Sequence, residues 1–457
     1  MRFINLTRQT EIGANSYFLE LGGKKLVLDA GLHPKQEGEA ALPNYKLVTD
    51  GSLDAILISH AHQDHIGSLP VLMRRQPQAG VFMTGPTAKL SDVMLHNSVN
   101  VMLRQREELG LSGYPLFTHR EADHAVQAWQ SVGFRQHWTV EGERIPGPDK
   151  GLTFEMYQSG HILGAAGILI RGEGKTVFYT GDVNFLEQTL MRGADFPETE
   201  IDVLIIETTR GDRALDKGYT RKSEEERFLA ALEAAFDRGG SILIPVFALG
   251  KTQEVLAMLH LFKRRGDLQR VPIYIGGLST KITTVHDQLA SESARQYEGL
   301  QLLDSVGPRV LNGREIAATQ IGRRKIFALS SGMMTEKTLS NLLAERFLSD
   351  PRHSVFFVGY ADPDSPAGRL KVAQQGELIQ LDRAAPSHEL VCHVSEFDFS
   401  AHAPRDLLFD YIRKISPKTV VLVHGDPPAV SWFETKISAE LPGVKTVVPQ
   451  PGQEYEF

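Results

Sequence analysis

The segment SHAHQDHIG, residues 59–67, places three histidines and one aspartate within six positions, directly after the apolar run DAILI. All four side chains can bind a metal ion, because neutral imidazole and carboxylate are ligands that zinc takes at about 2.0–2.2 Å. Residues two apart in an extended loop point the same way, so we expect His60 and His62 to face one ion. Asp64 and His65 would then turn toward a neighbouring ion. The alternative is a solvated polar loop that binds nothing.

The bulk composition is that of an ordinary globular protein, with 457 residues, 42% of them hydrophobic and 23% charged. This length predicts two domains. Apolar runs stop short of the ~20 residues that a membrane helix needs, and the N-terminus lacks the apolar core of a signal peptide. A single cysteine, Cys392, excludes an intrachain disulfide. We therefore expect a cytoplasmic protein without membrane association, and the net charge of −7 argues against coating nucleic acid through bulk electrostatics.

Short apolar runs recur along the chain, and many of them end at a polar residue. They include KLVLDAG, DAILISH, TVFYTGD, DVLIIETT, SILIPVFALG, KIFALSSGMM, HSVFFVGYAD and TVVLVHGD. Amphipathic stretches such as SEEERFLAALEAAFDRG and KTQEVLAMLHLFKRRG lie between them, which predicts an α/β chain. SYFLELGGKKLVLDAG and AAGILIRGEGKTVFYTGD predict two similar hairpins. Ligands in α/β folds gather at the carboxyl ends of strands, where these polar residues stand.

Three further metal-binding residues stand at such strand ends. They are His161 in SGHILGAAG, Asp182 in YTGDVN and His424 in VLVHGD. Each alone would be an unremarkable polar residue. Together with the cluster at 59–67 they complete a site for two metal ions, in which a carboxylate can bridge.

The motif LDAG, with Asp29, is followed in the sequence by HAHQDH, His161, Asp182 and His424. In this order of motifs the chain resembles metallo-β-lactamase-fold hydrolases. More narrowly it resembles the β-CASP branch, the nucleases of RNA 3′-end processing and their prokaryotic relatives. The motifs that carry this narrower resemblance are IETTRGDR (206–213), IPVFALGKTQE (244–254), SSGMM (330–334), VGY (358–360) and DFSAHAP (398–404). The order HxHxDH, FSAH and VHG is specific for this branch.

The resemblance implies two zinc ions per chain, held by two groups of three ligands and one bridging carboxylate. These are His60, His62 and His161 for one ion, Asp64, His65 and His424 for the other, and Asp182 between them. Asp29 would orient a ligand loop. Asp64, Glu207 and His402 stand where the branch has catalytic residues, with His402 as the acid held by Glu207.

The resemblance also implies the architecture, an α/β chain with a four-layer αββα metallo-β-lactamase domain over 1–208 and 395–457. A β-CASP domain is inserted between them at 209–394. We expect SSGMM to start a helix, whose free N–H groups could bind phosphate at Ser330, Ser331 and Gly332. Plain helix capping is the equal alternative.

The implied function is a zinc-dependent phosphodiester hydrolase, a ribonuclease that cuts single-stranded RNA internally, from a 5′ end or both. The chain departs from the branch at ETTRG (207–211), GGLST (276–280) and ADPDSPAGR (361–369), which leaves the substrate open. The alternatives are single-stranded DNA or another phosphodiester as substrate, and a scaffold subunit without catalysis. The retained ligands disfavour the scaffold. A homodimer is compatible with the sequence.

Overall fold

The computed structural model describes residues 1–148, 151–293 and 295–457. The chain divides into two compact units. The first unit comprises Met1–Leu186, Gly193–Leu215 and His402–Phe457, and the second comprises Glu187–Arg192 and Asp216–Ala401. The predicted domain boundaries after residues 208 and 394 remain a proposal.

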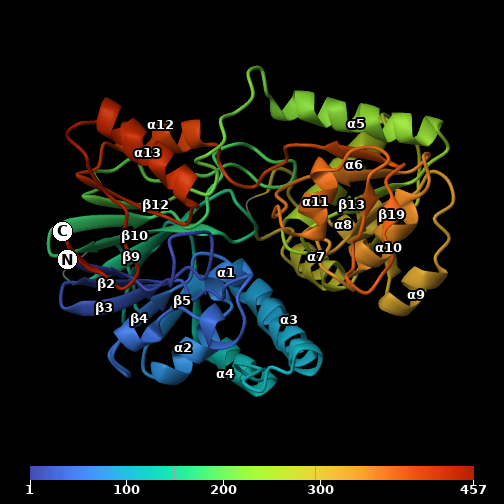
Figure 1. The fold of residues 1–457 in the computed structure, drawn as a ribbon. Helices are drawn as coiled ribbons and strands as arrows, with labels where there is room; N and C mark the ends of the chain where they lie inside the picture. The colour runs from blue at the N-terminus through green and yellow to red at the C-terminus, as the bar shows by residue number, and fades with distance from the viewer. Residues whose placement is uncertain (149–150, 294) are drawn as a thin grey trace. The chain divides into compact units, whose positions relative to one another are not determined.

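Two β-sheets form the centre of the first unit (Figure 1). One has the order β23 (Glu454–Glu456), β1 (Arg2–Asn5), β2 (Tyr17–Leu21), β3 (Lys24–Leu28), β4 (Ala55–Leu57), β5 (Gly80–Thr84) and β6 (Trp129–Val132). The other has the order β22 (Lys445–Val447), β21 (Thr419–Val423), β12 (Val203–Glu207), β11 (Lys175–Tyr179), β10 (Ala166–Gly172), β9 (Thr153–Gln158), β7 (His137–Thr139) and β8 (Arg144–Ile145).

Strand β12 shows how the apolar runs build layers. Val203 and Ile205 belong to the core between the two sheets, whereas Leu204 and Ile206 belong to the core on the outer face. A strand buried on both faces reads as a continuous apolar run, as VLII does. Outside the second sheet lie α12 (Arg405–Ile415) and α13 (Pro427–Glu440).

Outside the first sheet lie α1 (Gln63–Ile66), α2 (Leu69–Arg75), α3 (Gly85–Leu109) and α4 (His119–Ala128) (Figure 1). Helix, sheet, sheet and helix layers make the four-layer αββα sandwich that the sequence predicts. The fold class is therefore confirmed.

Both predicted hairpins form. Strands β2 and β3 pair antiparallel, with Tyr17 opposite Leu28, and β10 pairs with β11, with Ile168 opposite Tyr179. In the first turn, glycines occupy the two left-handed positions, Gly22 and Gly23, where φ is 62° and 73°. Two-residue hairpin turns favour such residues, because positive φ matches the twist of the strands.

The second unit contains a six-stranded parallel sheet. Its order is β15 (Arg309–Leu311), β14 (Ile273–Gly276), β16 (Ile326–Leu329), β13 (Ile242–Pro245), β17 (Ser354–Phe357) and β20 (His393–Glu396). Its helices are α5 (Arg221–Asp237), α6 (Lys251–Arg265), α7 (Leu278–Gln288), α8 (Leu302–Val306), α9 (Gly313–Ala318), α10 (Leu339–Leu348) and α11 (Pro366–Val372). A small ribbon pairs β18 (Leu378–Ile379) with β19 (His388–Glu389). Across the described residues, every helix is too short or too polar to cross a membrane.

The expectation that SSGMM starts a helix is wrong. Residues 330–334 form turns after β16, and α10 begins only at Leu339. The backbone of Met334 and Lys337 is left-handed, with φ of 52° and 65°, which interrupts a right-handed helix. The Ser331 hydroxyl oxygen accepts the N–H of Thr335 at 3.0 Å and so closes a local turn.

Candidate metal centre

The sequence-predicted ligands meet at one edge of the two sheets of the first unit. His60 and His62 lie in the segment between β4 and α1, Asp64 and His65 lie in α1 itself, and His161 lies in the loop between β9 and β10. Asp182 and His424 follow β11 and β21, which both lie parallel to β12. The carboxyl ends of neighbouring parallel strands meet at the same edge, so residues far apart in the sequence converge there.

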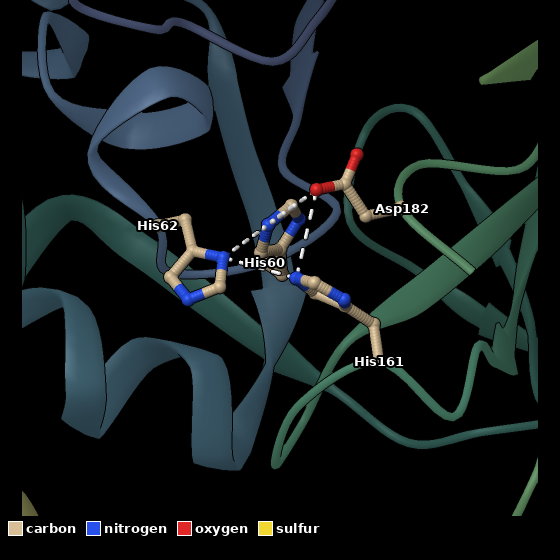
Figure 2. Close-up of side chains that lie close together, drawn as sticks. All are labelled: His60, His62, His161 and Asp182. Carbon is tan, nitrogen blue, oxygen red and sulfur yellow. Dashed lines mark hydrogen bonds and ion pairs between the residues drawn. The ribbon is translucent and has the colours of Figure 1, made fainter. Parts of the chain in front are cut away.

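A first group contains His60, His62, His161 and Asp182 (Figure 2). Nδ1 of His62 lies 3.2 Å from Nε2 of His60 and 3.0 Å from Nε2 of His161. Oδ2 of Asp182 lies 3.5 Å from Nε2 of both His60 and His161. Three nitrogens and one carboxylate oxygen therefore surround a single point.

A second group contains Asp64, His65 and His424. Nε2 of His424 lies 3.4 Å from Oδ2 of Asp64, and Nε2 of His65 lies 3.8 Å from the same oxygen. The other carboxylate oxygen of Asp182, Oδ1, lies 3.3 Å from Nε2 of His65. The two oxygens of Asp182 thus face different groups, as a bridging ligand requires.

Two buried atoms of these ligand groups indicate whether a metal ion fits between the side chains. Nε2 of His424 has no hydrogen-bond partner within the part of the chain that the structure describes, and Oδ1 of Asp182 has none beyond its ion pair with Nδ1 of His424 at 2.8 Å. Buried polar groups without partners are costly, unless an ion satisfies them. Imidazole nitrogens and carboxylate oxygens are the donor set of a zinc site. The residues therefore fit a metal ion at each group.

The charges of the site agree with this donor set. Burial lowers the pKa of His60 well below its ordinary value, and the neighbouring His65 adds to this effect. His60 is therefore neutral, as a ligand must be. At His424 burial works in the same direction, but the carboxylates of Asp182 and Asp64 outweigh it and raise the pKa to about 10. The two carboxylates thus hold a positive charge next to them, which a metal ion can supply in place of the proton.

Asp29 fixes the orientation of His65 from behind. Its carboxylate accepts the N–H and hydroxyl of Ser59, both at 2.7 Å, and the hydroxyl of Tyr179 at 2.6 Å. The same carboxylate lies 2.7 Å from Nδ1 of His65. A proton on Nδ1 leaves a lone pair on Nε2 of His65, the atom that lies 3.3 Å from Oδ1 of Asp182.

Sequence reasoning missed three of the residues behind the ligands: Ser59, Tyr179 and Asn15. The side-chain nitrogen of Asn15 lies 3.0 Å from Nε2 of His65, and the hydroxyl of Tyr17 donates to the Asn15 oxygen at 2.8 Å. Tyr179 ends a strand and Asn15 precedes one. Their position at strand ends is the only sequence signal that could have indicated a role beside the ligands.

His402 and Glu207 lie beside the first group. Nδ1 of His402 lies 3.1 Å and 3.3 Å from the two oxygens of Glu207. Glu207 is held in turn by the N–H groups of Val183 and Thr209 at 2.8 Å and 3.2 Å. Although burial opposes it, the carboxylates of Glu207 and Asp182 raise the pKa of His402. Asp182, Glu207 and His402 also converge closely enough to hold an ion.

The remaining predicted residues, Ser330, Ser331 and Gly332, belong to the second unit. None of the three groups above contains them.

Family models match three segments of the chain. Residues 18–209 match a metallo-beta-lactamase superfamily domain, residues 252–370 a Beta-Casp domain, and residues 387–449 a Zn-dependent metallo-hydrolase RNA specificity domain.

Curated relatives match over nearly the whole chain. Cleavage and polyadenylation specificity factor subunit 3 of Dictyostelium discoideum is 29% identical over 96% of this chain and 55% of its own length. An endoribonuclease of Schizosaccharomyces pombe is 27% identical over 96% of this chain and 56% of its own. An RNase J-like protein of Methanocaldococcus jannaschii is 27% identical over 96% of this chain and 97% of its own.

The chain thus spans little more than half the length of the two eukaryotic relatives. A crystal structure of a protein of unknown function from Enterococcus faecalis shares the fold, with a TM-score of 0.59, 12% identity and 99% of both chains covered. With three matched domains in the order that the motifs predict, the chain belongs to the β-CASP branch of the metallo-β-lactamase superfamily.

Proposed function

We propose that this protein is a zinc-dependent phosphodiester hydrolase that cleaves single-stranded RNA. The observation that carries the proposal is the carboxylate of Asp182, whose two oxygens face two separate groups of metal-binding side chains. An endoribonuclease and an RNase J-like protein among the relatives support RNA as the substrate.

One zinc ion would be held by His60, His62 and His161, the other by Asp64, His65 and His424, with Asp182 shared between them. Such a pair of ions, when bound, neutralises the phosphate charge and supplies a nucleophile at neutral pH. Asp29 keeps His65 in the tautomer that presents Nε2 to the metal, through the contact at 2.7 Å.

His402 would donate the proton that the leaving oxygen needs. Glu207 holds Nδ1 of the ring, and Nε2, which lies 3.9 Å from Oδ2 of Asp182, would carry the transferred proton. A proton donor must be charged before the reaction, and the raised pKa of His402 supports that state. His60, with its lowered pKa, has the opposite property and suits a ligand.

Ser330, Ser331 and Gly332 remain a proposed phosphate contact. Without a helix start at SSGMM, that contact would depend on the N–H and hydroxyl groups of the turn alone. The hydroxyl oxygen of Ser331 already accepts the Thr335 N–H.

A cleavage time course tests the function. RNA labelled at its 3′ end, carrying either a 5′ phosphate or a 5′ hydroxyl, should be cut by the zinc-loaded protein, and Asp182→Asn should be inactive. The product lengths show whether cutting is internal or stepwise from the 5′ end. Single-stranded DNA and a chromogenic phosphodiester serve as competing substrates. Faster turnover of either one would show that it, and not RNA, is the preferred substrate. No cleavage of any of the three would favour a scaffold subunit without catalysis.

A further inference from the structure

Two exposed aromatic side chains lie at one edge of the parallel sheet in the second unit. Phe247 follows β13 and Tyr360 follows β17, and these two strands are neighbours in the sheet. Phe247 is 37% exposed and Tyr360 is 49% exposed. Among the described residues, Tyr297 is the other large aromatic residue that is exposed. Two of the three thus stand at the carboxyl ends of adjacent strands, where α/β folds bind ligands.

The register of the sheet sets Phe247 beside the turn at residues 330–332. Pro245 of β13 is level with Leu329 of β16, and Phe247 and Ser331 each follow two residues later. A Cβ atom on Gly332 would lie 3.0 Å from Cδ2 of Phe247 and 3.1 Å from its Cε2. One edge of the Phe247 ring therefore rests on the turn, a contact that does not by itself cover either face of the ring.

Tyr360 stands on the other side of Phe247. Strand β13 pairs with β16 on one side and with β17 on the other. A Cβ atom on Gly359, directly before Tyr360, would lie 3.7 Å from Cε of Lys251, which begins α6 after the β13 loop. Neighbouring strands are about 4.8 Å apart. The turn, Phe247 and Tyr360 therefore form a row along the edge of the sheet.

The charges beside Tyr360 indicate which part of a nucleotide would face it. Asp362 and the exposed Asp364 follow Tyr360, and Oδ2 of Asp362 lies 3.5 Å from the Tyr360 hydroxyl oxygen. Carboxylates repel phosphate, so the phosphate backbone is disfavoured here. A nucleobase carries no net charge and stacks on an aromatic ring through its π-face. The two aromatic residues are therefore suited to bases rather than to phosphates.

We propose that Phe247 and Tyr360 bind neighbouring bases of the single-stranded RNA substrate by stacking. This inference rests on the proposed function and names residues of the second unit that hold the substrate. Stacking on a protein ring requires unstacked bases, so an intact duplex cannot use the two rings in this way. Because every base has a π-face, the rings would bind single strands without selecting a sequence.

Binding of single-stranded RNA by the whole chain tests the proposal. Fluorescence anisotropy with a labelled oligoadenylate is measured in the Asp182→Asn background, so that the RNA stays intact. Phe247→Ala and Tyr360→Ala should each bind about 5- to 150-fold more weakly than this parent, as expected for the loss of one stacked base. Phe247→Tyr and Tyr360→Phe keep a ring and should bind as the parent does. Tyr297→Ala removes an exposed aromatic side chain away from this edge and should also leave binding unchanged.

An abasic ribose-phosphate oligomer of the same length separates stacking from a general change of the surface. It should bind equally to the parent and to both alanine variants, because it has no base to stack. Weaker binding of oligoadenylate with unchanged binding of the abasic oligomer supports the proposal. An equal loss for both oligomers, or no RNA binding by the parent, would overturn it. Unchanged oligoadenylate binding by either alanine variant would also overturn it, and would leave a protein partner as the candidate occupant of the rings.

Cleavage is scored separately, with zinc-loaded protein that carries an intact Asp182. Cleavage by the wild type together with unchanged RNA binding by the alanine variants would reject the inference and keep the proposed function. Weaker binding by the variants while the wild type cuts no RNA would reject the nuclease and keep Phe247 and Tyr360 as RNA contacts. If circular dichroism shows that Phe247→Ala does not fold, Tyr360→Ala decides, because Tyr360 is the more exposed residue.

Discussion

Replacing His402 by alanine separates proton donation from metal binding. The ring of His402 lies 3.1 Å and 3.3 Å from the oxygens of Glu207 through Nδ1, and 3.9 Å from Asp182 through Nε2. Only the contact with Asp182 is longer than most contacts within the two ligand groups, which are 3.0–3.5 Å. His402 belongs to neither of these two groups, so we expect its removal to leave both of them intact.

The size of the effect follows from the role of a positioned acid. Loss of a general acid costs about 10²–10⁴-fold in rate, which corresponds to about 3–5 kcal/mol in the activation barrier. The variant His402→Ala should therefore cleave RNA 10²–10⁴-fold more slowly, yet keep its full zinc content. His424→Ala, by contrast, removes a ligand from the second group and should lose metal together with activity.

A substrate with a better leaving group is the decisive assay. A phosphodiester whose leaving group needs no proton should restore much of the rate of His402→Ala, because the missing acid is then not required. It should not restore His424→Ala. Zinc is measured in both variants in parallel. If His402→Ala loses half of its zinc, or shows no rescue, then His402 is a ligand and the acid assignment is wrong.

Three further changes test the surroundings of the site and the second unit. Glu207→Gln removes the charge that raises the pKa of the neighbouring acid, so the alkaline limb of the pH–rate profile should move to lower pH; an unmoved limb would contradict this. Tyr179→Phe removes a hydrogen bond to the buried Asp29 carboxylate and should cost about 1.5–3 kcal/mol in the free energy of unfolding, read from urea denaturation. Burial lowers the pKa of His286 to about 3, with Arg295 adding to it. In the unfolded chain His286 has a pKa near 6.5, so below that pH it binds a proton that the folded protein does not bind. The contribution of His286 to the free energy of unfolding is complete above about pH 6.5. It decreases by about 1.4 kcal/mol per pH unit as the pH falls from 6.5 to 3. In His286→Leu, the free energy of unfolding should depend less steeply on pH in this range. An equally steep decrease would refute the low pKa assigned to His286.

The convergence of the candidate ligands could be predicted from the sequence because metal chemistry restricts the residue types. His60, His62, Asp64 and His65 lie within six positions, at the loop after β4 and the start of α1, and the other candidate ligands stand near the ends of apolar runs or beside glycine turns. Parallel strands bring such ends together, so convergence could be expected without coordinates. The same runs predicted an α/β chain, since strands buried on both faces are continuously apolar, whereas the αββα layers were implied by the resemblance to the family.

What could not be predicted depends on contacts between distant segments. Asp29 receives the hydroxyl of Tyr179, 150 positions away, only because β3 and β11 lie in sheets that face each other. Residues Glu187–Arg192 belong to the second unit because the carboxylate of Glu254 accepts the N–H groups of Thr189 and Leu190 at 2.6 Å and 2.9 Å. Neither contact leaves a local pattern in the sequence.

The prediction of a helix start at SSGMM is wrong for a different reason. A serine pair before apolar residues is compatible with a helix start, but the left-handed backbone at Met334 and Lys337 delays the helix to Leu339. Positive φ at residues other than glycine has no reliable sequence signal.

The metal content of the purified protein tests the central claim most directly. Protein purified without added metal is analysed for zinc, alongside Asp182→Asn, in which the shared carboxylate can no longer bridge. We expect about two zinc ions per chain at the candidate metal centre in the wild type, and a loss of metal from both groups in Asp182→Asn. Fully active wild-type protein with one zinc ion or none, or Asp182→Asn with unchanged zinc, would contradict a centre built on the shared carboxylate.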